Sequence, residues 1–138
     1  MKNLIILCTG NSCRSQIADG YFKHFAGDNL KVYSAGIETH GVNPRAIKVM
    51  AEDGIDISNN TSNNITEYLE VDFDYIITVC DHAQENCPYI PGTGERVHYN
   101  FPDPAKATGT EDEILDSFRS TQQLIKDFAQ KFVTDRGL

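Results

Sequence analysis

The sequence predicts a three-layer α/β fold in which a four-stranded parallel sheet is flanked by helices. Two observations lead to this prediction. Segments that favour strands alternate along the chain with segments of helical spacing, which is typical of a parallel sheet with right-handed crossovers and helices on both faces. The length of 138 residues and the hydrophobic content of 40% suit one folded core. We therefore expect a single domain over residues 1–138.

The first half of the chain contains two of the expected strands. Residues 4–7 are all apolar, as in a strand that is buried on both faces. The pair Asn43-Pro44 is typical of a helix start, with Asn as the N-cap and Pro in the first turn. The expected elements are a strand at 2–7, a helix at 15–26, a strand at 30–35, a helix from Asn43-Pro44 to Gly54, a polar loop at 58–64 and a helical turn at 66–69.

The second half supplies two more strands and the longest helix. A strongly β-forming run at 73–79 ends in Cys80, just as the first strand ends in Cys8. Thr110 and Glu113 form a capping-box pattern that opens the last helix. The remaining elements are a loop at 88–94, a short strand at 96–99, a rigid turn at Phe101-Pro102-Asp103-Pro104, and a last helix with Ile114, Phe118, Ile125, Phe128 and Phe132 on its apolar face.

Composition and charge exclude several classes of protein. The net charge of −8 disfavours nucleic acids and anionic membranes as partners. No apolar run is long enough to cross a bilayer, and the first residues do not form a secretion signal. We therefore expect a cytoplasmic protein whose four cysteines are thiols rather than a disulfide framework. Nothing in the sequence demands an oligomer, so we expect a monomer.

The loop between the first strand and the first helix has the pattern of an anion site. Cys8 and Arg14 stand at the two ends of a Cys-x5-Arg segment. Backbone N–H groups and the helix N-terminus can surround an oxyanion, while the guanidinium holds two of its oxygens. The same groups lower the pKa of a thiol, so we expect Cys8 to be a nucleophilic thiolate, with Ser15 as a further donor to its sulfur. The expected binding residues are Thr9, Gly10, Asn11, Ser12, Cys13, Arg14 and Ser15.

Further reactive side chains are expected near this loop, because ligands of parallel sheets lie at the carboxyl ends of the strands. Cys80 follows the third strand, and Asp103 follows the fourth on a turn that two prolines make rigid. A carboxyl group held in this way suits a general acid.

Cys87 lies seven residues beyond Cys80. In a disulfide the two Cα atoms lie about 4.4–6.8 Å apart. A helix would place these Cα atoms about 10.5 Å apart, and an extended chain about 23 Å apart. A bond between the two cysteines therefore requires the segment to fold back. Zinc is disfavoured, because the cysteine spacings and the absence of a His pair do not match the usual zinc patterns.

Three motifs resemble those of the thioredoxin-coupled arsenate reductases, which share the fold of low-molecular-weight protein tyrosine phosphatases. The motifs are Cys8-Thr-Gly-Asn-Ser-Cys-Arg-Ser-Gln16, Val79-Cys80-Asp81 with Cys87-Pro88, and Phe101-Pro-Asp103-Pro-Ala105. The resemblance, which covers nearly the whole chain, implies that arsenate binds in the loop through Arg14. It implies that Cys8 attacks arsenic and that Asp103 protonates the leaving oxygen. Cys80 would then attack Cys8, and Cys87 would attack Cys80, leaving a Cys80–Cys87 disulfide for thioredoxin to reduce. A glutaredoxin or a small thiol is the alternative reductant.

The resemblance implies no tightly bound cofactor, but some relatives bind potassium beside the loop. Asn11, Ser34 and Thr61 stand where oxygen ligands are expected. Asp19 replaces a longer Glu, and Asn63 replaces an Asp, so the match to this potassium site is partial.

Two other functions use the same loop. A phosphatase would need only Cys8 and Asp103, but tyrosine phosphatases of this type tend to carry aromatic residues where this chain has Ala105-Lys106-Ala107. A redox-sensing or anion-binding module would stop at one stable disulfide, without turnover. The histidines form no ligand pattern and are interpreted as surface or turn residues: His24, His40, His82 and His98.

Overall fold

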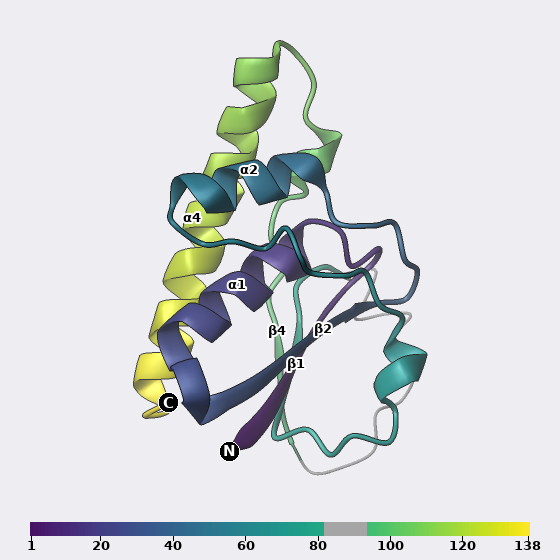
Figure 1. Cartoon of the computed structure of the whole chain (residues 1–138), viewed down its shortest axis with the longest axis vertical. Helices are drawn as coiled ribbons and strands as arrows, with labels where there is room; N and C mark the ends of the chain where they lie inside the picture. Colours follow the sequence, from purple (N-terminus) through teal and green to yellow (C-terminus); the bar gives the residue numbers. More distant parts are fainter. Residues whose placement is uncertain (82–93) are drawn as a thin grey trace.

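The computed structural model describes residues 1–81 and 94–138. Four parallel strands form one sheet in the order β2-β1-β3-β4, which confirms the predicted class of fold (Figure 1). The strands are β1 (Lys2–Cys8), β2 (Leu30–Gly36), β3 (Tyr75–Thr78) and β4 (Glu95–His98). The helices are α1 (Arg14–Ala26), α2 (Pro44–Glu52) and α4 (Glu111–Asp135), with 3-10 helices at Gly27–Asn29, Ile65–Tyr68 and Pro104–Lys106.

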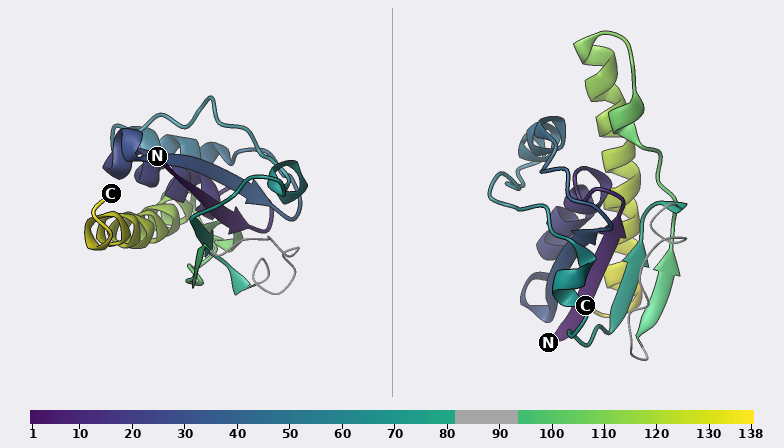
Figure 2. Two further views of the ribbon diagram at one scale, coloured as in Figure 1. Left: turned by 90° about the horizontal axis from the view of Figure 1, so that it is seen from below. Right: turned by 90° about the vertical axis from the view of Figure 1, so that its right-hand side faces the viewer.

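The central strand β1 is covered on both faces. Its residues Leu4 to Leu7 are each at most 2% exposed, as the uniform apolar run predicts. Figure 2 shows α1, α2 and α4 on one side of the sheet and the 3-10 helix at Ile65–Tyr68 on the other. Because all four strands are parallel, their carboxyl ends lie at one edge of the sheet, where β1 ends in Cys8.

Aromatic side chains join the helices to the sheet. Phe22 of α1 packs edge-on against Phe132 of α4, with ring centroids 5.4 Å apart, and Phe132 packs against Tyr75 of β3 at 5.3 Å. On the opposite face, Tyr33 of β2 meets Tyr68 at 5.1 Å. Full burial of such a side chain contributes roughly 1.5–3 kcal/mol, so these contacts stabilise the three-layer arrangement.

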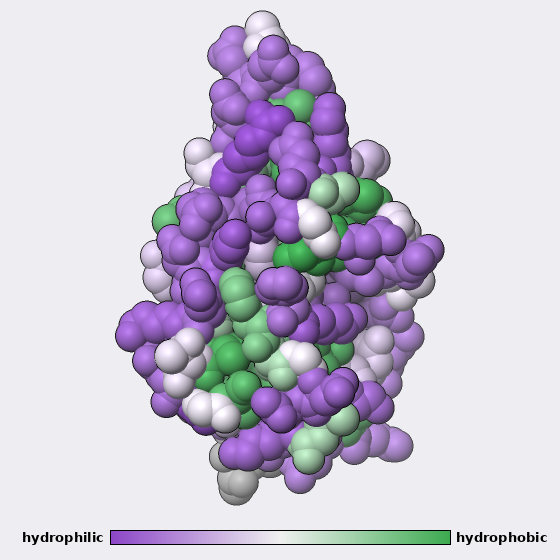
Figure 3. Space-filling view, turned by 60° about the vertical axis from the view of Figure 1, so that its left-hand side comes forward, coloured by the Kyte–Doolittle hydropathy of each residue, from purple (hydrophilic) through white to green (hydrophobic). Residues whose placement is uncertain are grey.

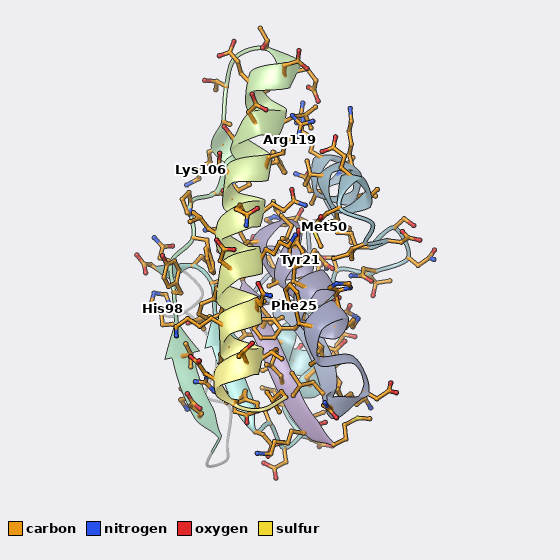
Figure 4. The ribbon with its side chains drawn as sticks, turned by 90° about the vertical axis from the view of Figure 1, so that its left-hand side faces the viewer. Tyr21, Phe25, Met50, His98, Lys106 and Arg119 are labelled. Carbon is orange, nitrogen blue, oxygen red and sulfur yellow. The ribbon has the colours of Figure 1, made fainter. Side chains whose placement is uncertain are left out.

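Polar contacts also link the three α-helices. Tyr21 of α1 donates to Asp53 at 2.7 Å, and Gln122 of α4 donates to the Tyr21 hydroxyl at 3.0 Å. Gln122 also donates to the carbonyl of Val49 in α2 at 2.9 Å. Figure 4 shows Tyr21 and Met50 pointing into the space between these helices. The contacts fix α2, whose preceding segment backs the anion loop described below.

Several element boundaries differ from the expectation. The strand expected at 73–79 is shorter, because β4 pairs with β3 only from Tyr75 to Thr78. The helix expected to reach Gly54 ends at Glu52, where the N–H of Asp53 bonds back to the Met50 carbonyl. On α4, Leu115 is 3% exposed and belongs to the core, whereas Ile114 is only partly buried. The capping box at Thr110 and Glu113 forms as predicted.

The described surface carries mostly polar side chains, and the face in Figure 3 is largely hydrophilic. None of the helices among residues 1–81 and 94–138 combines the length and the apolar character needed to span a membrane. The expected loop at 88–94, apart from Gly94, lies outside the described residues, and so does Cys87.

Candidate active site

The loop between β1 and α1 is held from outside through its carbonyl groups. Three of them accept backbone N–H bonds at 2.9 to 3.0 Å: Thr9 from Glu38, Gly10 from His40 and Ser12 from Asn43. In a trans peptide, the C=O and the following N–H point in opposite directions. The N–H groups at positions 10, 11 and 13 therefore turn toward the inside of the loop, as anion binding requires.

A buried side-chain network fixes the same loop from below. Asn11 has a φ of 46°, which an Asn tolerates better than most residues. Its Oδ1 accepts from Ser15 Oγ at 2.8 Å and from Gln16 Nε2 at 3.1 Å. The expectation that Ser15 donates to the Cys8 sulfur is wrong, because its hydroxyl supports the left-handed turn at Asn11 instead.

A pocket of about 650 Å³ brings together most of the predicted site residues. The lining residues from the prediction are Cys8, Thr9, Gly10, Ser12, Cys13, Arg14, Cys80 and Asp103. Asn11, within the loop, and Ser15, in the first turn of α1, do not line the pocket and are fully buried. Cys87 lies outside the described residues. The topology therefore gathers side chains from the ends of three strands at one edge of the sheet.

Arg14 is positioned by the segment that follows β4. Its Nη1 donates to the carbonyl of Phe101 at 3.0 Å, and its Nη2 lies 3.7 Å from Asp103 Oδ2. The Arg14 side chain is only 11% exposed. The carbonyl fixes one end of the guanidinium and leaves its other donors to the pocket, where a fork of N–H groups suits an oxyanion.

Asp103 is held by its own turn. Its Oδ1 accepts from the N–H of Ala105 at 3.0 Å, which caps the 3-10 helix at Pro104–Lys106. The other oxygen faces Arg14, and the side chain is 24% exposed. One carboxyl oxygen is thus fixed and the other is directed at the pocket, as a general acid requires.

Cys8 and Cys80 are buried thiols that contact one another at the base of the pocket. A hydrogen bond to Cys80 and burial raise the pKa of Cys8, while Arg14 and the Thr9 N–H lower it. Thr9 Oγ1 also lies 3.3 Å from Cys80 Sγ. The expected fall in the pKa of Cys8 is therefore wrong, because the hydrogen bond to the second thiol and burial outweigh Arg14 and the Thr9 N–H.

Cys13 caps the start of α1 and is also buried. Burial and the nearby carboxylate of Asp103 raise its pKa to about 12, against the opposing effect of Arg14. Cys13 is therefore a neutral thiol at physiological pH, and it contributes to the loop through its backbone.

The residues that match a potassium site are bonded to one another. The amide nitrogen of Asn11 donates to the carbonyl of Ser34 at 3.2 Å. The carbonyl of Thr61 accepts from Gln16 at 3.0 Å, and the Thr61 hydroxyl donates to Asn63 at 2.7 Å. An N–H donor thus stands where a cation would need an oxygen.

The Asp19 carboxylate is already paired with a lysine ammonium. Lys23 Nζ lies 3.0 Å from Asp19, and Asn60 donates to the same carboxylate at 2.9 Å. Lys23 lines the same small pocket as Ser34 and Thr61. The residues present do not fit a bound potassium ion.

The pocket also contains residues that the sequence analysis did not select. Asp81, Asn100 and Lys106 line it, and so does His40, whose Nδ1 would lie 2.4 Å from a Cβ at Gly10. His98 is only 24% exposed and bonds through both ring nitrogens, unlike a surface residue. Their positions could have indicated them, since His98 is the last residue of β4 and Asn100 lies just beyond it.

Comparison with known proteins places the chain in a family. A model described as "Low molecular weight phosphotyrosine protein phosphatase" matches residues 3–136. The chain belongs to this family. Within the low molecular weight phosphatase family, the "Arsenate reductase" of Halalkalibacterium halodurans is 51% identical over 133 residues, which cover 94% of this chain and 96% of the relative. The "Arsenate reductase" of Bacillus subtilis is 49% identical over 136 residues, covering 94% and 98%.

Several solved structures are also similar to this chain. An arsenate reductase in an oxidized state is 30% identical, with a TM-score of 0.84 and 98% coverage of both chains. An arsenate reductase in a phosphate-binding state is 30% identical, with a TM-score of 0.81 and the same coverage. Vibrio vulnificus Wzb in complex with benzylphosphonate is 22% identical over 97% of this chain and 98% of its own, with a TM-score of 0.80, and shares the fold.

Proposed function

We propose that this protein reduces arsenate to arsenite through a relay of three cysteines, with a dithiol protein of the thioredoxin type as reductant. The observation that carries the proposal is the contact between the Cys8 and Cys80 thiols at the base of the anion pocket. The relatives named arsenate reductase at about half identity support it. So does the similarity to arsenate reductases in reduced, oxidized and phosphate-binding states.

The first step is binding of the tetrahedral anion. The inward N–H groups of the loop and the guanidinium of Arg14 hold the arsenate oxygens above Cys8. The Cys8 sulfur attacks arsenic and its thiol proton passes to an arsenate oxygen, while Asp103 gives a proton to the hydroxyl group that leaves as water. Arg14 stabilises the negative charge that remains on the arsenic-bound oxygens.

The second step reduces arsenic. The Cys80 thiolate attacks the Cys8 sulfur, forming an S–S bond, and the S–As bond breaks with its electron pair on arsenic. Arsenic falls from the +5 to the +3 state and leaves as arsenite, while the two thiols become a disulfide. Cys87 then displaces Cys8 from Cys80, and the reductant converts the Cys80–Cys87 disulfide back to thiols.

The proposal is tested by arsenate-dependent NADPH oxidation coupled through thioredoxin and its reductase. We expect turnover by the parent and no turnover by Cys8→Ser, Cys80→Ser or Cys87→Ser. Mass spectrometry of Cys87→Ser after arsenate should show one turnover that ends at a Cys8–Cys80 disulfide. Full-rate turnover by Cys87→Ser would overturn the relay, and absence of arsenite from the parent would overturn the reductase.

Phosphate-ester hydrolysis is the alternative, because Cys8, Arg14 and Asp103 would suffice for it. Two observations disfavour it as the main activity. Ala105 and Lys106 line the pocket where an aryl phosphate would need an aromatic partner, and Cys80 stands beside the nucleophile. Two results together would favour the phosphatase. The parent would hydrolyse p-nitrophenyl phosphate faster than it reduces arsenate, and the Cys80→Ser variant would keep this hydrolysis.

A further inference from the structure

Three side chains form a continuous chain of hydrogen bonds at the carboxyl ends of β3 and β4. Thr78 Oγ1 lies 2.7 Å from His98 Nδ1, and His98 Nε2 lies 2.7 Å from Asp81 Oδ1. In Figure 4, His98 projects from the end of β4 at the outer edge of the sheet. The chain of bonds ties the residue that directly follows Cys80 to the last strand.

The chemistry of the groups fixes the direction of these bonds. A carboxylate only accepts, so His98 Nε2–H is the donor to Asp81. In the neutral ring Nδ1 is then the acceptor, and the Thr78 hydroxyl donates to it. The Thr78 residue is 9% exposed and the His98 side chain 24%, so partial burial protects this end of the chain from water. The backbone N–H of Asp81 adds a bond to Asn100 Oδ1 at 3.3 Å.

On the N-terminal side of Cys80, the backbone is fixed by hydrogen bonds to neighbouring segments of the sheet. The N–H of Val79 donates to the Leu7 carbonyl at 3.0 Å, and the Val79 carbonyl accepts from the Phe101 N–H at 3.1 Å. Cys80 thus stands between two anchors, one made by the backbone of the sheet and one made by His98 through Asp81. Loss of the second anchor weakens the hold on the Cys80 backbone on one side, where the N–H of Asp81 still bonds to Asn100 at 3.3 Å.

Attack of one sulfur on another depends on their relative placement. A misplacement of about 1 Å can reduce the rate of such a step by roughly 100-fold. The Cys80 thiol is 3% exposed and already contacts Cys8, so its backbone has to stay in place for the S–S bond to form.

We propose that His98 is a positioning residue for Cys80, because it holds Asp81 and thereby the backbone from which this thiol attacks Cys8. For arsenate, the inference rests on the proposed function. In the step concerned, the new bond joins the two sulfurs, and the S–As bond breaks with its electron pair on arsenic. His98 exchanges no proton with the reactants and touches neither sulfur.

The position of Cys80 matters in any reaction in which Cys80 forms a disulfide with an oxidised Cys8. The role of His98 can therefore be tested without arsenate. Hydrogen peroxide converts the Cys8 thiolate to a sulfenic acid with release of hydroxide. The Cys80 thiolate then forms the disulfide and displaces a second hydroxide. Dimedone competes by trapping the sulfenic acid. The ratio of disulfide to dimedone adduct therefore reports the Cys80 step, independently of how fast Cys8 is oxidised.

The variants are made in the Cys87→Ser chain so that the Cys8–Cys80 disulfide accumulates. His98→Phe keeps a ring but loses both hydrogen bonds, whereas His98→Gln keeps a donor for Asp81. We expect His98→Phe and Asp81→Ala each to lower the ratio roughly threefold, because the Asp81 carboxylate is 62% exposed and water screens the lost bond. In the double variant His98→Phe and Asp81→Ala, the ratio should fall no further than in either single variant, because both changes remove the same bond. His98→Gln should restore most of the ratio.

Two controls separate positioning from a general loss of structure. His24→Phe changes an exposed histidine of α1 and should leave the ratio unchanged. Phosphate affinity, measured by protection of Cys8 from iodoacetamide, should equal that of the parent in every variant. A parental ratio in His98→Phe, or an equal loss of phosphate affinity, would overturn the proposal. If arsenate yields no disulfide in any variant while peroxide shows the His98 effect, the proposed function fails and the positioning role stands.

Discussion

At the scale of single residues, each reactive side chain has its properties set by a specific partner. Arg14 is oriented by the carbonyl of Phe101, and Asp103 by the N–H of Ala105. The pKa of Cys8 is raised by the thiol of Cys80. Residue type and spacing therefore identify the reactive groups, while their orientation and ionisation follow from the fold.

The guanidinium of Arg14 provides the first prediction. Arg14→Lys keeps the positive charge but loses the planar fork that bonds Phe101 and two anion oxygens at once. We expect kcat/KM for arsenate to fall roughly 10- to 100-fold, the size of one or two charge-assisted hydrogen bonds. Arg45→Lys, which alters an exposed pair with Glu111, is the matched control. Equal kinetics for the two variants would contradict a role of Arg14 in holding the anion.

The sequence identified the site residues better than it identified their contacts. Cys8, Cys80 and Asp103 were predicted to meet because a parallel sheet brings the ends of its strands to one edge. The bond expected from Ser15 to the Cys8 sulfur was wrong, because the Ser15 hydroxyl donates instead to Oδ1 of Asn11, the residue in the left-handed turn. That turn depends on neighbours from β2, which no local pattern specifies.

At the scale of elements, the anion loop is shaped by the segment that links β2 to α2. This segment supplies the three N–H groups that turn the loop carbonyls outward. At its start, Gly36 packs against the loop itself. A Cβ on Gly36 would lie 2.7 Å from both the Asn11 nitrogen and the Thr9 oxygen. The close approach of β2 to the loop therefore requires a residue without a side chain.

Gly36→Ala tests this close approach. Because the clashing atoms are backbone, the loop itself has to move, and we expect phosphate affinity to fall roughly tenfold or more. Gly41→Ala is the control, since it has a φ of +77° but open space around its Cβ. It should lose about 1 kcal/mol of stability to backbone strain and keep its phosphate affinity. Isothermal titration with phosphate and thermal melts of both variants would check the two effects separately.

The order of elements was predictable, and some of their packing was not. Alternating strands and helices predicted the parallel sheet, and Thr110 with Glu113 predicted the start of α4. The choice of Leu115 over Ile114 for the core was missed, because the two residues precede Phe118 by three and four positions and both spacings fit one face of a helix. The role of His98 was missed because its two partners, Thr78 and Asp81, belong to the end of β3 and to the segment just beyond it.

At the scale of the whole molecule, ion pairs tie α4 to the elements around it. Arg119 and Lys126 of α4 bond to Glu52 and Asp53 at the end of α2, and Glu111 at its start bonds to Arg45. Arg136 at the other end pairs with Glu95 of β4. With a net charge of −8, the protein places much of its positive charge in these contacts.

These pairs predict loss of stability in acid. The cationic partners and, for Asp53, the Tyr21 hydroxyl hold the pKa values of four carboxyl groups below their ordinary range: Glu52, Asp53, Glu95 and Glu111. Because the unfolded chain binds these protons more readily, the free energy of unfolding should fall as the pH drops through about 4 and below. Asp19 acts in the opposite sense, because burial raises its pKa.

The double variant Glu52→Gln and Glu111→Gln isolates the contribution of the pairs between α2 and α4. Glutamine keeps the size of each side chain but no longer titrates, so the variant should be less stable than the parent at neutral pH. Its free energy of unfolding should also fall less steeply toward acid, because two of the four depressed pKa values have been removed. Urea titrations at several values between pH 7 and about 3 measure both quantities. Parallel pH curves for variant and parent would show that these pairs do not link α4 to α2 in solution, since the surface charges would then titrate alike in the folded and unfolded chains.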